Sequence, residues 1–281
     1  MPVFAIPFPA IDPVAIEVGP LAVRWYALAY MAGILVGWWY ALKLVRNDAL
    51  WGGMPGPISQ KNIDDFLLFA TVGLILGGRL GYVLFYQPGY YLANPGDIIK
   101  VWEGGMAFHG GFLGFLAAVF LFSAWRKLPP LSLGDVCSAV VPIGLFFGRI
   151  ANFINGELWG RVSDVPWAMV FPFAGPEPRH PSQLYQAGME GIVLFLVLLF
   201  VTHKLKGLRH PGFVTGVFIA GYGCARIVGE QFRQPDAGIG FLWGGLTMGM
   251  LLSVPMVLAG LALAYWAKSR PAIDASAKAH D

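Results

Sequence analysis

The stretch that decides the fold is residues 64–86, which read DDFLLFATVGLILGGRLGYVLFY. From Phe66 to Phe85 only one side chain is charged, that of Arg79. About 20 predominantly apolar residues suffice for one helix to cross the hydrocarbon core of a bilayer. The stretch therefore predicts a transmembrane helix that carries one arginine.

Similar apolar runs, bounded by polar residues, proline or glycine, recur along the chain. They predict seven helices, at residues 23–44, 64–86, 108–125, 133–154, 187–202, 213–232 and 241–266. The composition agrees, because 57% of the 281 residues are hydrophobic and 12% are charged, against about 25% charged in a soluble domain. We therefore predict an all-α integral membrane protein with one seven-helix domain, residues 1–267, and exclude a soluble globular enzyme.

Three segments lie outside the predicted helices. Residues 1–20 contain five prolines and no basic residue, so they predict an N-terminal arm, neither a helix nor a cleaved signal peptide. The long loop at residues 155–186 is rich in Trp, Pro and Gly and predicts a small folded cap outside the membrane. Residues 268–281 are polar and small, which is typical of a disordered tail.

The Lys and Arg residues in and beside the loops predict an orientation. Eleven fall on one side of the predicted bundle: Lys43, Arg46, Lys61, Arg126, Lys127, Lys204, Lys206, Arg209, Lys268, Arg270 and Lys278. Four fall on the other: Lys100, Arg161, Arg179 and Arg233. By the positive-inside rule, the N-terminus and the cap are expected outside and the C-terminal tail in the cytoplasm.

The net charge and the cysteines limit the kinds of partner and metal site that can be expected. The net charge of +3 is small and the basic residues form no run, so no nucleic-acid partner is expected. Cys137 and Cys224 lie singly inside apolar runs, which indicates neither a disulfide framework nor a thiolate metal site.

Three arginines within predicted helices require an explanation, because a charged side chain in a bilayer is unfavourable and usually lines a cavity or pathway. Arg79, Arg149 and Arg226 all fall toward the outer ends of their helices. Tyr26 and His109 begin helices in the same layer. Because a planar guanidinium matches phosphate oxygens, the three arginines predict a site for an anionic lipid headgroup.

Structural explanations compete with that site. Arg226 and Glu230 are four residues apart and could pair along one helix face, and Arg79 could extend to the interface. Gly-xxx-Gly spacings indicate close helix packing rather than chemistry. They occur at Gly33/Gly37, Gly77/Gly81, Gly110/Gly114, Gly144/Gly148 and Gly240/Gly244.

Residues 148–161, GRIANFINGELWGR, resemble the signature of the bacterial prolipoprotein diacylglyceryl transferases. Four further segments match the family: residues 24–26 (RWY), 104–111 (GGMAFHGG), 179–185 (RHPSQLY) and the helical series from Tyr222 through Arg226 and Glu230 to residues 233–236 (RQPD). The resemblance covers residues 20 to 265, and it implies no metal and no cofactor.

The resemblance implies transfer of the diacylglyceryl group of phosphatidylglycerol to the lipobox cysteine of a prolipoprotein signal peptide. A thioether forms and glycerol phosphate leaves, in the inner membrane of a bacterium and among its lipids. The functional residues that it implies are Tyr26, His109, Arg149, Asn152, Asn155, Glu157, Gly160, Tyr222, Arg226, Glu230 and Arg233.

The chemistry gives roles to some of these residues. An unperturbed thiol is only a few per cent ionised at neutral pH, so a general base is expected. His109, at the start of a helix, is the first candidate, since a positive helix end keeps the ring neutral; a role limited to hydrogen bonding stays open. His180 in the cap, Tyr26 and Glu230 are its rivals.

The signature itself leaves some roles open. Asn152 and Asn155 share a helix face if the helix extends that far, and there they could orient phosphate or hydroxyl oxygens. Glu157 is expected to pair with Arg161 or another guanidinium, in preference to a direct catalytic part. Arg161, in the loop, is expected in a wetter environment than the membrane arginines.

Other classes of protein remain to be compared. A transporter or flippase for an anionic lipid or solute would use the same arginines without covalent chemistry. The signature at residues 148–161 disfavours it, because an Asn-rich helix end running into a folded cap suits an enzyme that accepts a peptide. A seven-helix receptor is disfavoured by the short, sparse cytoplasmic loops.

Overall fold

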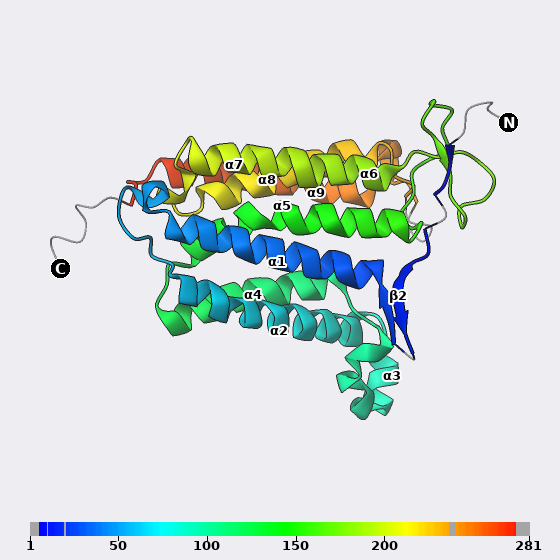
Figure 1. The fold of residues 1–281 in the computed structure, drawn as a ribbon, viewed down its shortest axis with the longest axis horizontal. Helices are drawn as coiled ribbons and strands as arrows, with labels where there is room; N and C mark the ends of the chain where they lie inside the picture. The colour runs from blue at the N-terminus through cyan, green and yellow to red at the C-terminus, as the bar shows by residue number, and fades with distance from the viewer. Residues whose placement is uncertain (1–5, 10, 20, 236–239, 274–281) are drawn as a thin grey trace.

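The computed structural model describes residues 6–9, 11–19, 21–235 and 240–273. Among these residues, seven helices are long and apolar enough to span a membrane, as predicted (Figure 1). They are α1 (Trp25–Arg46), α2 (Gln60–Phe85), α4 (Phe108–Arg126), α5 (Pro130–Ile154), the continuous helix Ser182–His203, α8 (Phe213–Glu230) and α9 (Met248–Lys268). The chain is a multi-pass membrane protein.

The fifth span is built from three parts: α6 (Ser182–Gln186), the π-helix η4 (Ala187–Val193) and α7 (Leu194–His203). The shorter helices are α3 (Pro88–Ala93), η1 (Asp48–Trp51), η2 (Pro95–Ile99), η3 (Val101–Glu103), η5 (Gly207–Arg209) and η6 (Trp243–Gly245). The fifth span begins at Ser182, five residues before the predicted start, so the cap is confined to residues 155–181.

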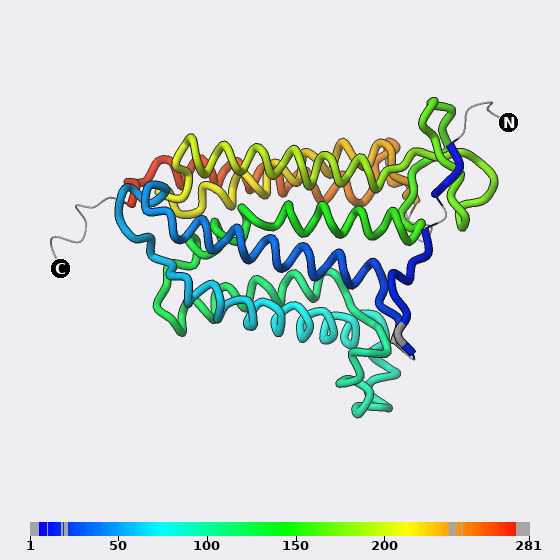
Figure 2. Tube along the Cα trace, viewed as in Figure 1, coloured from blue at the N-terminus to red at the C-terminus, as the bar shows by residue number. Residues whose placement is uncertain are grey.

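The N-terminal arm forms strands. β2 (Val14–Val18) and β3 (Leu21–Arg24) make an antiparallel hairpin that leads directly into α1. β1 (Ile6–Pro7) pairs in parallel with β4 (Met169–Val170) of the cap. The arm and the cap therefore lie together at one end of the bundle, which we call the cap end (Figure 2).

The seventh span starts at Met248, seven residues later than predicted. Gly244 and Gly245 have φ of 72° and 77°, in the left-handed region that interrupts a helix. The Thr247 hydroxyl then accepts a hydrogen bond from the backbone N–H of Met250 and caps the new helix. Gly240 and Gly244 thus lie outside the helix, and their predicted role in helix packing is wrong.

Glycines bring α2 and α4 into backbone contact, as their spacing predicts. A Cβ added to Gly77 would lie 2.3 Å from the carbonyl oxygen of Gly110, and one added to Gly114 would lie 2.0 Å from that of Gly73. Either distance is a severe clash. In the same way, α8 and α9 approach closely at Gly216. These contacts make α2/α4 and α8/α9 tightly packed pairs.

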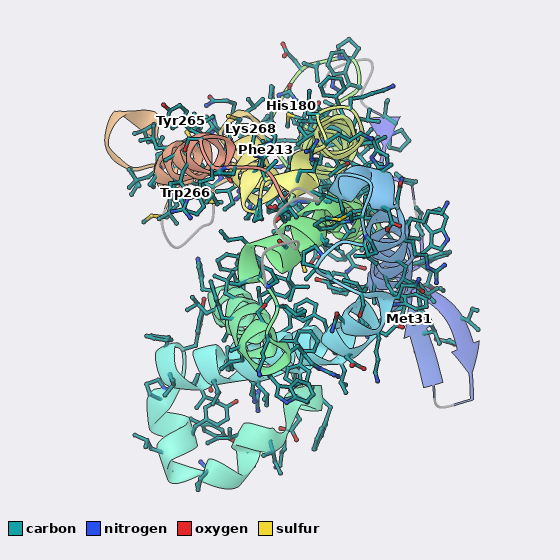
Figure 3. All side chains as sticks on the ribbon, turned by 90° about the vertical axis from the view of Figure 1, so that its left-hand side faces the viewer. Met31, His180, Phe213, Tyr265, Trp266 and Lys268 are labelled. Atoms are coloured by element: carbon teal, nitrogen blue, oxygen red, sulfur yellow. The ribbon has the colours of Figure 1, made fainter. Side chains whose placement is uncertain are left out.

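The outer faces of the helices are apolar. Tyr265, Met31 and Leu68 are exposed over 79%, 55% and 66% of their surfaces, and Figure 3 shows Tyr265 and Met31 pointing away from the bundle. A surface of this kind is unfavourable in water and suits the hydrocarbon of a bilayer. The structure therefore agrees with the membrane assignment made from composition.

The interior changes in character along the bundle axis. Far from the cap, the core is densely apolar around Trp51, Phe122 and Leu133, each at most 1% exposed. One buried carboxylate there, Asp135 of α5, accepts hydrogen bonds from the backbone N–H groups of Gly212 and Thr215 and so caps α8. Toward the cap, the interior becomes polar and charged.

Candidate active site

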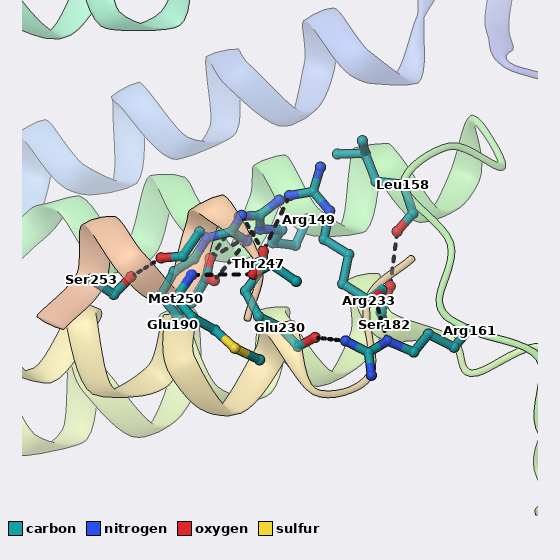
Figure 4. A network of polar contacts seen from close by, with 12 residues as sticks. Arg149, Leu158, Arg161, Ser182, Glu190, Glu230, Arg233, Thr247, Met250 and Ser253 are labelled. Atoms are coloured by element: carbon teal, nitrogen blue, oxygen red, sulfur yellow. Dashed lines mark hydrogen bonds and ion pairs between the residues drawn. The ribbon is translucent and has the colours of Figure 1, made fainter. Parts of the chain in front are cut away.

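A cluster of charged side chains lies inside the bundle near the cap end (Figure 4). Arg149 of α5 donates from Nε and Nη2 to Oε2 of Glu190 in η4, at 3.0 and 2.9 Å. Arg226 of α8 places Nη2 2.5 Å from Oε1 of Glu230 and Nη1 4.0 Å from Oε1 of Glu190. Glu190, whose side chain is fully buried, thus lies between two arginines from different helices.

A third arginine and a hydroxyl face the same carboxylates. Arg233 places Nη1 3.8 Å from Oε1 of Glu230. Thr247 donates its hydroxyl proton to Oε2 of Glu230 at 2.7 Å. Within the described residues, Nη1 of Arg226 is buried without a hydrogen-bond partner, so the cluster has a charged donor available for an anion.

The backbone explains how two carboxylates come to be buried there. Glu190 lies in the π-helical turn η4, a rare local widening found often at functional sites. Glu230 packs against α9 at Gly249, where an added Cβ would lie 2.7 Å from the carboxyl carbon. A small pocket lies between the end of α8 and the start of α9. It is lined by Arg226, Glu230, Arg233, Pro235, Gly240, Thr247, Met248 and Gly249.

Glu190 is the functional candidate that the sequence analysis missed. It lies within the apolar run at residues 187–202 and is the only charged residue there. An acidic residue inside a membrane helix is itself a signal for a functional site. Glu190 is therefore identifiable from the sequence as an acidic residue in a membrane helix, but its pairing with Arg149 depends on how two helices pack.

The end of α5 forms a second polar group. Asn152 and Asn155 donate from Nδ2 to Oε1 of Glu157, at 2.8 and 3.4 Å, so the two asparagines share a face as predicted. The expected pairing of Glu157 with Arg161 or another guanidinium is not found among the described residues, because Arg161 donates to backbone carbonyls of α8 and the loop after it instead. Tyr26 of α1 lies within electrostatic range of Glu157 and of Arg149, which connects this group to the arginine cluster.

The cap is fastened to the end of α8. Arg161 donates from Nη2 to the carbonyl oxygen of Glu230 at 2.9 Å and from Nε to that of Arg233 at 3.0 Å. Gly160 is required for this contact, since an added Cβ would lie 2.5 Å from the carbonyl oxygen of His180 and 2.7 Å from that of Phe232. Arg161 is half-buried, as Arg149 and Arg226 are, so the expected difference in exposure between them is not seen.

Arg79 does not join the cluster. Its guanidinium is 4% exposed and donates to four backbone carbonyls of the loop between α3 and α4, those of Asp97, Ile98, Gly104 and Gly105. The expectation of one convergent set of three arginines is therefore wrong. Two of them converge, and the third holds a loop.

The remaining candidates are placed less closely. Tyr222 lies one turn before Arg226 on α8, within range of the charges of Arg149 and Glu190. His109, the second residue of α4, is exposed and its ring contacts Phe108. Within the described residues, no hydrogen bond or ion pair joins His109 to Arg149 or Arg226.

His180 differs from His109 in its surroundings. Its Nδ1 is 3.1 Å from the hydroxyl of Tyr185, and its ring packs on Phe232. Burial, and next the positive charge of Arg161, lower the pKa of His180 below its usual value. The lowered pKa favours the neutral ring, which lies in the cap beside the contact between the cap and α8.

The sequence of this chain is similar to known proteins over most of its length. The family model described as prolipoprotein diacylglyceryl transferase matches residues 13–266. A protein of Rhodopseudomonas palustris is 59% identical over 276 residues, which are 97% of this chain and 96% of that protein. One of Nitrobacter winogradskyi is 60% identical, with 97% and 94% covered. Both are named phosphatidylglycerol–prolipoprotein diacylglyceryl transferase.

Proposed function

The chain belongs to the prolipoprotein diacylglyceryl transferase family, and we propose that it transfers the diacylglyceryl group of phosphatidylglycerol to the lipobox cysteine of a prolipoprotein. One observation carries the proposal more than any other. Arg149 and Arg226 come from different membrane helices and face the same buried carboxylate, and Nη1 of Arg226 is buried without a hydrogen-bond partner among the described residues. The matching family and this available donor support a phosphodiester substrate.

The reaction is a displacement at carbon. The thiolate of the peptide attacks the carbon of the diacylglyceryl group that bears the phosphate. A C–S bond forms there, and the bond between that carbon and the phosphate oxygen breaks. The electron pair leaves with the phosphate oxygen, so the products are a thioether and glycerol phosphate. Negative charge grows on the leaving phosphate, and fixed guanidinium groups in a low-dielectric site stabilise such charge strongly.

We assign the phosphate to Arg149 and Arg226, with Glu190 and Glu230 holding the two guanidinium groups in place before substrate arrives. Arg149 donates through Nε and Nη2 to one oxygen of Glu190, and Arg226 contacts one oxygen of Glu230, so each guanidinium is held by a charged partner. Arg233 and Tyr222 complete this side of the site. The other side of the site is proposed to be formed by Tyr26 of α1 and by four residues at the end of α5 and in the cap, namely Asn152, Asn155, Glu157 and Gly160.

His109 is proposed as the general base for the thiol. Its exposed position at the start of α4 leaves the ring free to meet a substrate. His109→Gln keeps a hydrogen-bonding side chain but cannot take the proton, so the transfer rate should fall about 10²- to 10⁴-fold. The transfer rates of the wild type and the variant should also depend differently on pH, because only the wild type has a side chain at this position that can take the thiol proton. Matching pH profiles with a small rate difference would make His109 a positioning residue.

The proposed setting is the inner membrane of a bacterium, with the N-terminus and cap in the periplasm. The asymmetry of Lys and Arg across the bundle supports this orientation. A cysteine introduced by Gly175→Cys should react with a membrane-impermeant maleimide in intact spheroplasts, and a reporter fused after Lys268 should be cytoplasmic. Labelling at position 175 only after permeabilisation would reverse the orientation.

The activity itself is tested with purified protein, phosphatidylglycerol vesicles and a lipobox peptide, with the peptide analysed by mass spectrometry. The peptide should gain the mass of one diacylglyceryl group, and a control peptide with serine in place of the cysteine should not. A transporter or flippase would instead move lipid between leaflets and leave both peptides unchanged. That result would overturn the proposed function.

A further inference from the structure

Two glutamines of α6 are buried without full hydrogen bonding. Gln183 and Gln186 are each 0% exposed. Gln183 donates from Nε2 to the carbonyl oxygen of Glu157 at 2.6 Å, yet within the described part of the chain its Oε1 has no partner. Neither Nε2 nor Oε1 of Gln186 has a partner there either. Three amide atoms are thus buried and unpaired along one turn of helix.

The amide of Gln186 lies close to the arginine cluster. Gln186 precedes Glu190 by four residues, so it lies on the same face of the helix, one turn nearer the cap. A Cβ built on Gly229 would lie 3.6 Å from Nε2 of Gln186, which places the amide against α8 beside Glu230. The unpaired amide therefore lies between the charged cluster and the cap.

Buried polar groups almost always find partners, because an unpaired one loses its interaction with water and gains nothing in return. An unpaired amide at a functional site is therefore a natural contact for a substrate. The proposed substrate carries neutral polar groups next to its phosphate, namely the two free hydroxyls of the headgroup glycerol. These lie farther from the acyl chains than the phosphate does.

We propose that Gln186, together with Oε1 of Gln183, binds the glycerol hydroxyls of the phosphatidylglycerol headgroup and makes the enzyme selective for a polyol headgroup. The inference rests on the proposed function, because it takes the phosphate to lie on Arg149 and Arg226. The phosphate on the arginines then places the glycerol one turn nearer the cap, at the amides.

The chemistry of the amides matches this headgroup. A hydroxyl both donates and accepts, and two hydroxyls find two acceptors in the Oε1 atoms of Gln183 and Gln186 and a donor in Nε2 of Gln186. A headgroup without hydroxyls would leave the same amides unpaired. Sites built to bind a hydroxyl reject analogues that lack it much more strongly than apolar pockets reject a size change.

The test combines one variant with two lipids. Gln186→Leu removes the amide at similar size, and phosphatidylpropanol keeps the phosphate and acyl chains of phosphatidylglycerol but has no free hydroxyl. For phosphatidylglycerol, kcat/KM should fall about 10- to 100-fold in Gln186→Leu. For phosphatidylpropanol, wild type and variant should have equal, low kcat/KM values. Gln231→Leu, an exposed glutamine at the end of α8, is the matched control and should leave both lipids unaffected.

The outcomes separate this inference from the function on which it rests. Wild-type protein that transfers nothing from phosphatidylglycerol contradicts the proposed function. If the wild type is active and Gln186→Leu lowers kcat/KM for both lipids by the same factor, Gln186 has a packing role and the inference is overturned. An active Gln186→Leu with wild-type preference between the lipids also overturns it. Loss of preference in a folded, active variant supports it.

Discussion

Two arginine sites in the same layer of the bundle differ in their partners. Arg79 is almost fully buried, and its guanidinium donates to backbone carbonyls of one loop. Arg149 donates to a carboxylate of another helix, and Arg226 pairs with Glu230 of its own helix, as the spacing of four residues allows, and lies 4.0 Å from Glu190 of another. Position along the membrane normal is therefore not sufficient to assign a role to a membrane arginine.

The two kinds of partner differ in whether a substrate anion can replace them at the guanidinium. A backbone carbonyl carries no net charge and is fixed by the loop it belongs to, so Arg79 stabilises one conformation of residues 94–107. A carboxylate is an anion and competes with a phosphate for the same guanidinium. Oε1 of Glu190 lies 4.0 Å from Arg226, too far for a hydrogen bond, which leaves donor capacity on Arg226 for substrate. The partner of an arginine thus indicates its role.

The largest effect is expected from conservative changes in the carboxylate-paired site. Arg149→Lys and Arg226→Lys keep the charge but lose the planar fork, so each should lower the rate of transfer about 10²- to 10³-fold, as expected for lost transition-state donors. The rate should be measured with phosphatidylglycerol vesicles and a lipobox peptide. Arg126→Lys, whose partner Asp65 lies at the opposite end of the bundle, is the control. Near-normal turnover in both site variants would reduce the cluster to a general electrostatic role.

Arg79→Lys tests the arginine that binds backbone carbonyls. One ammonium group cannot reach carbonyls as widely spread as those of Asp97, Ile98 and Gly104, so about two charged hydrogen bonds are lost, at roughly 1.5–3 kcal/mol each. Thermal unfolding in detergent should show a lower Tm, and limited proteolysis should cut within residues 94–107. Folded protein should lose much less activity than Arg149→Lys does. A selective loss of activity with unchanged stability would place Arg79 in the active site.

Arg161 falls between the two kinds of site, because it binds backbone carbonyls that belong to Glu230 and Arg233 themselves. Arg161→Lys retains a cation near the C-terminal end of α8, where positive charge is favourable, but it loses the paired contact. We expect a decrease in kcat of about tenfold, the equivalent of one hydrogen bond of about 1.4 kcal/mol. KM for the peptide should change little. Wild-type kinetics in Arg161→Lys would show that the end of α8 needs no help from the cap.

The sequence predicted the fold more fully than the site, for physical reasons. Apolar runs mark membrane helices one at a time, so the seven spans could be found without knowing how they pack. The start of α9 could not, because it depends on the backbone conformation at Gly244 and Gly245. The partners of Arg79 and Glu157 depend on contacts between distant segments, which periodicity does not contain. Asn152 and Asn155 were predictable because both lie on one helix.

The smallest effect concerns the pH dependence of the cap. Burial, and then Arg161, lower the pKa of His180 in the folded protein, whereas the unfolded chain has a histidine pKa of about 6.5. Below that pH the unfolded chain takes up a proton that the folded cap resists, so the stability of the cap should fall as the pH falls and stay constant above about 7.

Hydrogen exchange of residues 155–181, corrected for the intrinsic effect of pH, measures this stability. His180→Asn keeps a hydrogen-bonding group near Tyr185 but does not titrate, so its cap should show no such decrease between about pH 6.5 and 5. Because the cap carries the Arg161 contacts to Glu230 and Arg233, acid should loosen the carboxylate-paired site before it loosens the Arg79 loop. Equal protection of residues 94–107 and 155–181 at every pH would mean that the two regions open together and that His180 does not tune the cap.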